Sequence, residues 1–152
     1  MYKRILLPLD GSDVAEQAAP HAVAQARLCG AELILLRVLE PFLHVRGLST
    51  ADLARIRQQS EEWASEYLDG LVKAVQEEGV LVQKAVGEGR PQAARLQFAE
   101  ANNADLIVIC TRGRSGFSRW LMGSVADRVI RGAKIPVLLV RAQGEGAHRT
   151  QG

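Results

Sequence analysis

The chain has 152 residues, of which 47% are hydrophobic and 24% are charged, with a net charge of +2. This length and composition predict one globular domain with its own core and exclude wholesale disorder. The basic residues are scattered and only 5% of residues are aromatic, so no nucleic-acid partner is expected. Because no apolar run suits a signal peptide or a membrane span, we expect a cytoplasmic protein without a membrane partner.

The first part of the chain predicts a strand, a turn, a helix and a second strand. Residues 5–7 form a short apolar run, typical of a strand buried on both faces, which we expect to end at Pro8. The tripeptide DGS predicts a turn, and its serine, Ser12, suits the N-cap of a helix reaching about residue 28. A second, nearly continuous apolar run predicts a strand over residues 33–39.

A long amphipathic helix is predicted next, capped by Ser49 or Thr50 and reaching about residue 78. Its apolar residues recur at intervals of three and four. Trp63 and Tyr67 lie on this periodicity, so we expect them in the core rather than in a ligand-binding platform.

The second half of the chain repeats the alternation of strands and helices. The remaining predicted elements are a strand over 80–86 near the sheet edge, a helix over 91–101, a strand over 106–109, a helix opened by Ser124 and a strand over 135–140. Residues 143–152 are expected to form a disordered tail, which leaves one domain over residues 1–142.

This order of elements predicts an α/β fold, a five-stranded parallel sheet with helices on both faces. In such sheets, ligands bind beyond the carboxyl ends of the strands, near the point where the strand order reverses. The carboxyl end of the first strand carries Asp10, and that of the fourth carries a glycine-rich loop over residues 110–116. We therefore expect the acidic side chain and the glycine loop to face one crevice.

The glycine-rich segment has the physical ingredients of a phosphate-binding site. Gly113 and Gly123 are separated by nine residues, and Ser124 follows at a helix start. Glycines let backbone N–H groups approach an anion, and the helix N-terminus adds unpaired donors. A standard dinucleotide motif and a P-loop are both absent, and no nucleophile–base pair or paired carboxylates indicate catalytic residues.

Segments along the whole chain resemble the universal stress protein family. They are ILLPLDGS, RVLEP, GRSGFSRWLMGSVADRVI and IPVLLVR. The resemblance implies a Rossmann-like fold of the adenine-nucleotide alpha-hydrolase-like type. ATP-binding members carry the pattern G-x2-G-x9-G-[ST], which Gly113, Gly123 and Ser124 match, whereas Cys110 stands at the first glycine. Nucleotide binding survives this change if Cys110 has ordinary β-region backbone angles and turns its side chain into the sheet.

The resemblance also implies roles for individual residues. The phosphates would be bound by Gly113, Gly123, Ser124 and the backbone N–H of Val125, and the adenosine by Pro8, Leu9 and Val38. Asp10 would act on the triphosphate through Mg²⁺ or Mn²⁺. Arg112, beside the loop, could neutralise phosphate charge. Simpler roles stay open for four of these residues: an N-cap for Ser124, a turn for Asp10, core packing for Val38 and a solvated surface position for Arg112.

The last predicted strand, from Ile135 to Arg141, lies at one end of the sheet, where an open edge invites pairing. The resemblance implies a homodimer in which these strands associate across a two-fold axis.

Three functions remain compatible with the sequence. The leading hypothesis is an ATP-binding universal stress protein that acts as a nucleotide-dependent stress-response switch. The second is slow, metal-dependent hydrolysis of ATP, and the low expected rate reflects the lack of a general base beyond Asp10. The third is a dimeric interaction protein in which Cys110 prevents nucleotide binding.

Overall fold

A computed structural model describes residues 1–41, 46–111 and 124–143 of the chain. Its strands form one parallel five-stranded sheet with the order β3-β2-β1-β4-β5. The strands are β1 (Arg4–Leu9), β2 (Glu32–Leu39), β3 (Val82–Glu88), β4 (Leu106–Thr111) and β5 (Val137–Arg141). The helices are α1 (Asp13–Glu16), α2 (Ala19–Cys29), α3 (Thr50–Glu77), α4 (Pro91–Ala101) and α5 (Ser124–Gly132).

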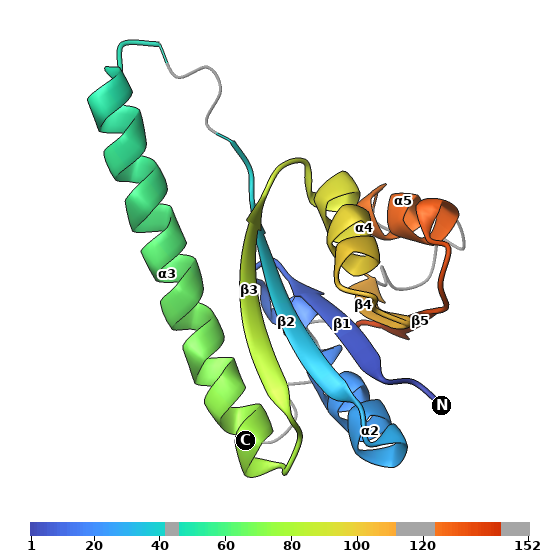
Figure 1. Cartoon of the computed structure of the whole chain (residues 1–152). Helices are drawn as coiled ribbons and strands as arrows, with labels where there is room; N and C mark the ends of the chain where they lie inside the picture. The colour runs from blue at the N-terminus through green and yellow to red at the C-terminus, as the bar shows by residue number, and fades with distance from the viewer. Residues whose placement is uncertain (42–45, 112–123, 144–152) are drawn as a thin grey trace.

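Helices cover both faces of the sheet, as the sequence predicted (Figure 1). One core cluster joins alternate residues of β1, β2 and β4 to α2 and α3. The other cluster joins the intervening strand residues to α4 and α5. Successive strand side chains point to opposite faces, so the continuous apolar runs of the central strands supply both layers. Among the described residues, no helix is both long enough and apolar enough to cross a membrane.

Four details correct the sequence predictions. The first strand continues through Pro8 to Leu9 instead of ending at Pro8. The predicted first helix is divided into α1 and α2, and Pro20 stands in the first turn of α2. Proline lacks an N–H and is therefore favoured where a new helix begins. In addition, β3 begins at Val82 rather than at residue 80, and β5 begins at Val137, directly after a proline.

Trp63 was expected in the core, and this prediction is wrong, since 63% of the residue is exposed. The buried residues of α3 are Ala64, Leu68 and Val75, which recur at helical spacing. Trp63 precedes Ala64 by one position and lies about 100° away from that stripe around the helix. Tyr67 is half-buried and packs against the first core cluster, as predicted.

Candidate functional site

The strand order reverses between β1 and β4, and Pro8 influences how the sheet is paired there. The carbonyl of Lys3 accepts a bond from β2, and the carbonyl of Arg4 accepts one from Asp105, directly before β4. The backbone N–H and C=O groups of successive residues point alternately to the two sides of a strand. Residue 8, like residue 4, therefore directs its backbone polar groups toward β4. Proline has no N–H to donate. The β1–β4 register accordingly runs only from Ile5 to Leu6.

A pocket of about 320 Å³ lies at this point, beyond the paired part of β1 and β4. Four of the predicted site residues line it together: Pro8, Asp10, Cys110 and Val125. They come from the ends of β1 and β4 and from the first turn of α5. The expected convergence of Asp10 with the end of the fourth strand is therefore found.

The turn after β1 holds the carboxylate of Asp10 in a defined position. Oδ1 of Asp10 accepts hydrogen bonds from the backbone N–H of Ser12 at 2.9 Å and from its hydroxyl at 2.5 Å. Ser12 is also the N-cap of α1, as predicted, because its hydroxyl accepts a bond from the N–H of Ala15. Gly11 between them has φ +84°, a left-handed conformation that favours glycine.

The surroundings of Asp10 favour its ionised form. Burial raises the pKa of this carboxyl, but the two hydrogen bonds from Ser12 and the positive charges of Arg95 and Arg37 lower it. The pKa of Asp10 therefore lies below its ordinary value of 3.8. An ionised carboxylate is the form that binds a metal ion.

Cys110 occupies an ordinary strand position near the end of β4, in register with Val140. Asn103 is the one non-glycine residue with positive φ in the described part of the chain, so Cys110 has no left-handed backbone. Its half-buried side chain packs against the first core cluster and also borders the pocket. Burial raises the pKa of its thiol. Its strand geometry is the one that the sequence analysis required, while its side chain lies both against the core and at the pocket.

Of the other predicted site residues, the structure describes three and leaves three outside the described ranges. Leu9 is buried in the first core cluster and is not among the residues that line this pocket. Val38 is half-buried against the second core cluster. Ser124 begins α5, as predicted. Arg112, Gly113 and Gly123 lie outside the described residues.

The structure adds Arg95 of α4 to the pocket, a residue that we did not predict from the sequence. Its Nε atom is buried and has no hydrogen-bond partner in the described part of the protein. Burial lowers the pKa of Arg95, whereas the charge of Asp10 raises it. A sequence signal existed: Arg95 precedes Phe98 by three positions and Ala99 by four, which puts a charge on the apolar face of this helix.

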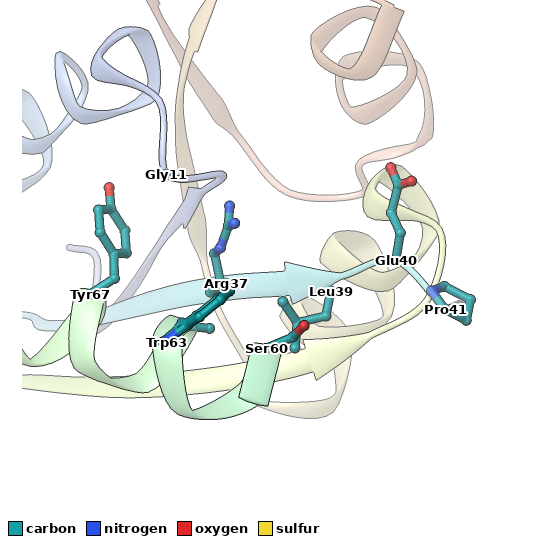
Figure 2. A pocket seen from close by; sticks show the side chains of 9 residues that line it. Gly11, Arg37, Leu39, Glu40, Pro41, Ser60, Trp63 and Tyr67 are labelled. Carbon is teal, nitrogen blue, oxygen red and sulfur yellow. The ribbon is translucent and has the colours of Figure 1, made fainter. Parts of the chain in front are cut away.

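A second pocket of about 450 Å³ lies beside this site, between the end of β2 and α3 (Figure 2). Arg37 points from β2 toward the turn at Gly11, while Trp63 and Tyr67 project from α3 (Figure 2). The hydroxyl of Tyr67 donates a 2.6 Å hydrogen bond to Glu16 and so links α3 to α1. Burial and this bond raise the pKa of Tyr67.

The sheet order and the pocket at its reversal point define a Rossmann-like α/β protein. The sequence model of the universal stress protein family matches residues 1–141. The chain therefore belongs to the universal stress protein family.

Curated relatives support the same assignment. Universal stress protein MJ0531 of Methanocaldococcus jannaschii is 39% identical over 143 residues, which are 93% of this chain and 83% of the relative. A universal stress protein of Thermus aquaticus is 38% identical over 93% of this chain and its own full length.

Solved structures extend the comparison. The protein MJ0577 of M. jannaschii has a TM-score of 0.78 and 29% identity, over 95% of this chain and 99% of its own. A universal stress protein in complex with cAMP has a TM-score of 0.71 and 24% identity, over 93% and 98% of the two chains. An Arabidopsis thaliana family protein with AMP bound has a TM-score of 0.69 and 17% identity, over 97% of each. The last two show the shared fold.

Proposed function

We propose that this protein binds adenine nucleotides, with ATP as the physiological ligand, and acts as a nucleotide-dependent switch in a stress response. The observation that carries the proposal is the pocket at the reversal point, where Asp10, Cys110 and the first turn of α5 meet. A helix N-terminus favours phosphate, and ligands of doubly wound sheets bind at this edge. Bound AMP and cAMP in two proteins of this fold support the choice of an adenine nucleotide.

We assign separate sets of residues to the adenosine and to the phosphates of the nucleotide. Its adenosine would contact the side chain of Pro8, the backbone of Leu9 and Val38. Its phosphates would lie near Cys110 and the backbone N–H of Val125, where α5 begins. The residues assigned to the phosphates from the family motif are Gly113, Gly123 and Ser124, with Arg112 as a neutralising charge.

We propose that Asp10 and the phosphates of the nucleotide together bind a divalent cation. Within the described residues, no group of three or more His, Cys, Asp or Glu side chains is arranged to hold a metal ion. Both hydrogen bonds from Ser12 end on Oδ1, so Oδ2 is the oxygen left for Mg²⁺ or Mn²⁺. These cations often use one or two carboxylates together with ligand phosphates. Bound there, the cation would screen the phosphates from the carboxylate.

The switch would work through the surface that changes when the nucleotide binds. Contacts between ATP and the segment from Thr111 to Ser124 alter what a protein partner meets at this edge. We further propose that the protein is a cytoplasmic homodimer paired through the strand at residues 135–141, since β5 is an edge strand in the observed sheet.

The direct test begins with freshly purified protein. Denaturation should release adenine nucleotide, and titration of nucleotide-free protein should show ATP binding that Mg²⁺ alters. Accumulation of ADP with time would instead support slow hydrolysis. Absence of released nucleotide and of measurable affinity for ATP would support the interaction role and overturn the proposal.

The phosphate assignment has its own variant. Gly123→Val places a branched side chain where the family motif has glycine, so ATP binding should be lost. Far-UV circular dichroism should show that the fold is retained. Unchanged ATP affinity in a folded Gly123→Val protein would show that this loop does not bind the phosphates.

A further inference from the structure

Arg95 combines features that an ordinary surface arginine lacks. It lies on α4, is half-buried, and lines the pocket at the reversal point. Its Nε is shielded from solvent without a hydrogen-bond partner among the described residues. Arginine carries its five N–H donors in a fixed planar fork, and an unpaired buried donor is costly to a fold. The arrangement therefore leaves donor capacity unused beside a pocket.

The described residues do not provide a close carboxylate partner for this guanidinium. None of the ion pairs formed within residues 1–41, 46–111 and 124–143 includes Arg95. Asp10 borders the same pocket and attracts Arg95 electrostatically, but two hydrogen bonds from Ser12 already hold its Oδ1. The pocket thus holds one carboxylate and one guanidinium that form no close ion pair with each other among the described residues.

A second feature of the pocket also favours an anion. Val125 and Ala126, in the first turn of α5, line it together with Arg95. The first N–H groups of a helix have no partner within the helix, and its dipole is positive at this end. A guanidinium and the start of a helix that line one pocket together are suited to the tetrahedral oxygens of a phosphate group.

We infer that Arg95 is a phosphate-binding residue of this site, which pairs its guanidinium with a phosphate group of the bound nucleotide. This inference rests on the proposed function and adds a residue outside the glycine motif. Because Arg95 brings a positive charge that is part of the protein, affinity for ATP persists when divalent cations are removed by chelation. The cation at Asp10 then strengthens binding without being required for it.

The test compares the protein with Arg95→Leu, which removes the guanidinium but keeps an apolar side chain against the core. ATP and adenosine are titrated calorimetrically in the presence of EDTA. ATP affinity should fall about 10- to 100-fold, as expected when a charge-assisted hydrogen bond is lost. Adenosine affinity should stay unchanged, since adenosine has no phosphate. Arg95→Lys should keep part of the ATP affinity.

Arg27→Leu is the matched control, because Arg27 is exposed at the end of α2 and pairs with Glu78 on the surface. It makes the same change in charge and should leave ATP affinity unchanged. Thermal unfolding gives a second readout: without nucleotide, Arg95→Leu should melt no lower than the parent, since it removes a buried unpaired donor.

Each outcome decides between the inference and the proposed function. If the parent binds ATP and Arg95→Leu binds it equally tightly, the inference is overturned while nucleotide binding stands. Equal losses of ATP and adenosine affinity would show that Arg95 only shapes the pocket, which also overturns the inference. A parent that binds neither ATP nor adenosine would overturn the proposed function, and the inference with it.

Discussion

Asp10 and Ser12 form a closed hydrogen-bonded pair at the end of the first strand. The carboxylate accepts both the backbone N–H and the hydroxyl of Ser12, while the same hydroxyl accepts the N–H of Ala15. One side chain therefore starts α1 and orients the carboxylate at the pocket. The turn and binding interpretations of Asp10 are compatible, because the turn uses Oδ1 and leaves Oδ2.

Ser12→Ala should lower the free energy of unfolding by about 1 kcal/mol, the usual cost of losing an N-cap. Urea denaturation at neutral pH measures the change. Ser60→Ala is the control, since the described residues show no hydrogen bond from the Ser60 side chain and alanine is favourable within α3. Equal stability of Ser12→Ala and the parent would contradict the capping role.

The stabilising contribution of Asp10 should disappear in acid. Because its pKa is lower in the folded protein than the ordinary 3.8, the unfolded chain binds more protons as the pH falls. The contribution is complete above the unfolded pKa and is lost as the pH falls through the folded pKa. The stability difference between the parent and Asp10→Asn should therefore shrink from about pH 5 downward. Urea denaturation at several pH values measures it, and a difference that stays constant would refute the charge-based explanation.

Cys110→Gly restores the first glycine of the family motif and tests whether the thiol obstructs the nucleotide. We expect ATP affinity to change by less than about twofold, because Cys110 already has strand geometry and packs against the core. Stability should fall by about 1 kcal/mol through lost packing and added chain entropy. Calorimetric titration and urea denaturation measure the two effects, with Cys29→Ala as the control. A tenfold gain in affinity would show that the thiol narrows the site.

Leu139→Lys tests the proposed dimer. Leu139 is 36% exposed on β5, an edge strand, and a lysine there discourages edge pairing. Light scattering at micromolar concentration should give a dimer mass for the parent and a monomer mass for the variant. Leu81→Lys, at a 71% exposed position beside the opposite edge strand β3, should leave the mass unchanged. A monomeric parent would refute the proposed dimer.

Much of the fold could be predicted because local patterns and tertiary structure agree. The helix from Pro91 to Ala101 was predicted with its observed bounds, since proline suits a first helical turn and an Asn-Asn turn follows. Ser49 was one of the two caps predicted for α3, and it forms a complete capping box with Asp52. Buried parallel strands produce apolar runs that few other elements share.

The wrong predictions for Pro8 and Trp63, and the omission of Arg95, arise where segments distant in the sequence determine the structure. Pro8 reads locally as a strand end, but the pairing with β2 extends the strand past it. Trp63 follows helical periodicity, yet the sheet covers only the neighbouring stripe of α3. Arg95 stands on the apolar face of its helix, but the sequence does not show which pocket it lines. Its proposed role in phosphate binding depends on Asp10 and α5, which are far from it along the chain but line the same pocket.

Pro8 has one further consequence, which concerns the energetics of binding. Its missing N–H is a covalent property, so the separation of β1 from β4 at their carboxyl ends exists before any ligand arrives. A ligand that enters there does not have to break a ladder of hydrogen bonds or reorganise the central strands. The site is in this respect preorganised, and less of the binding free energy is spent on rearranging the backbone.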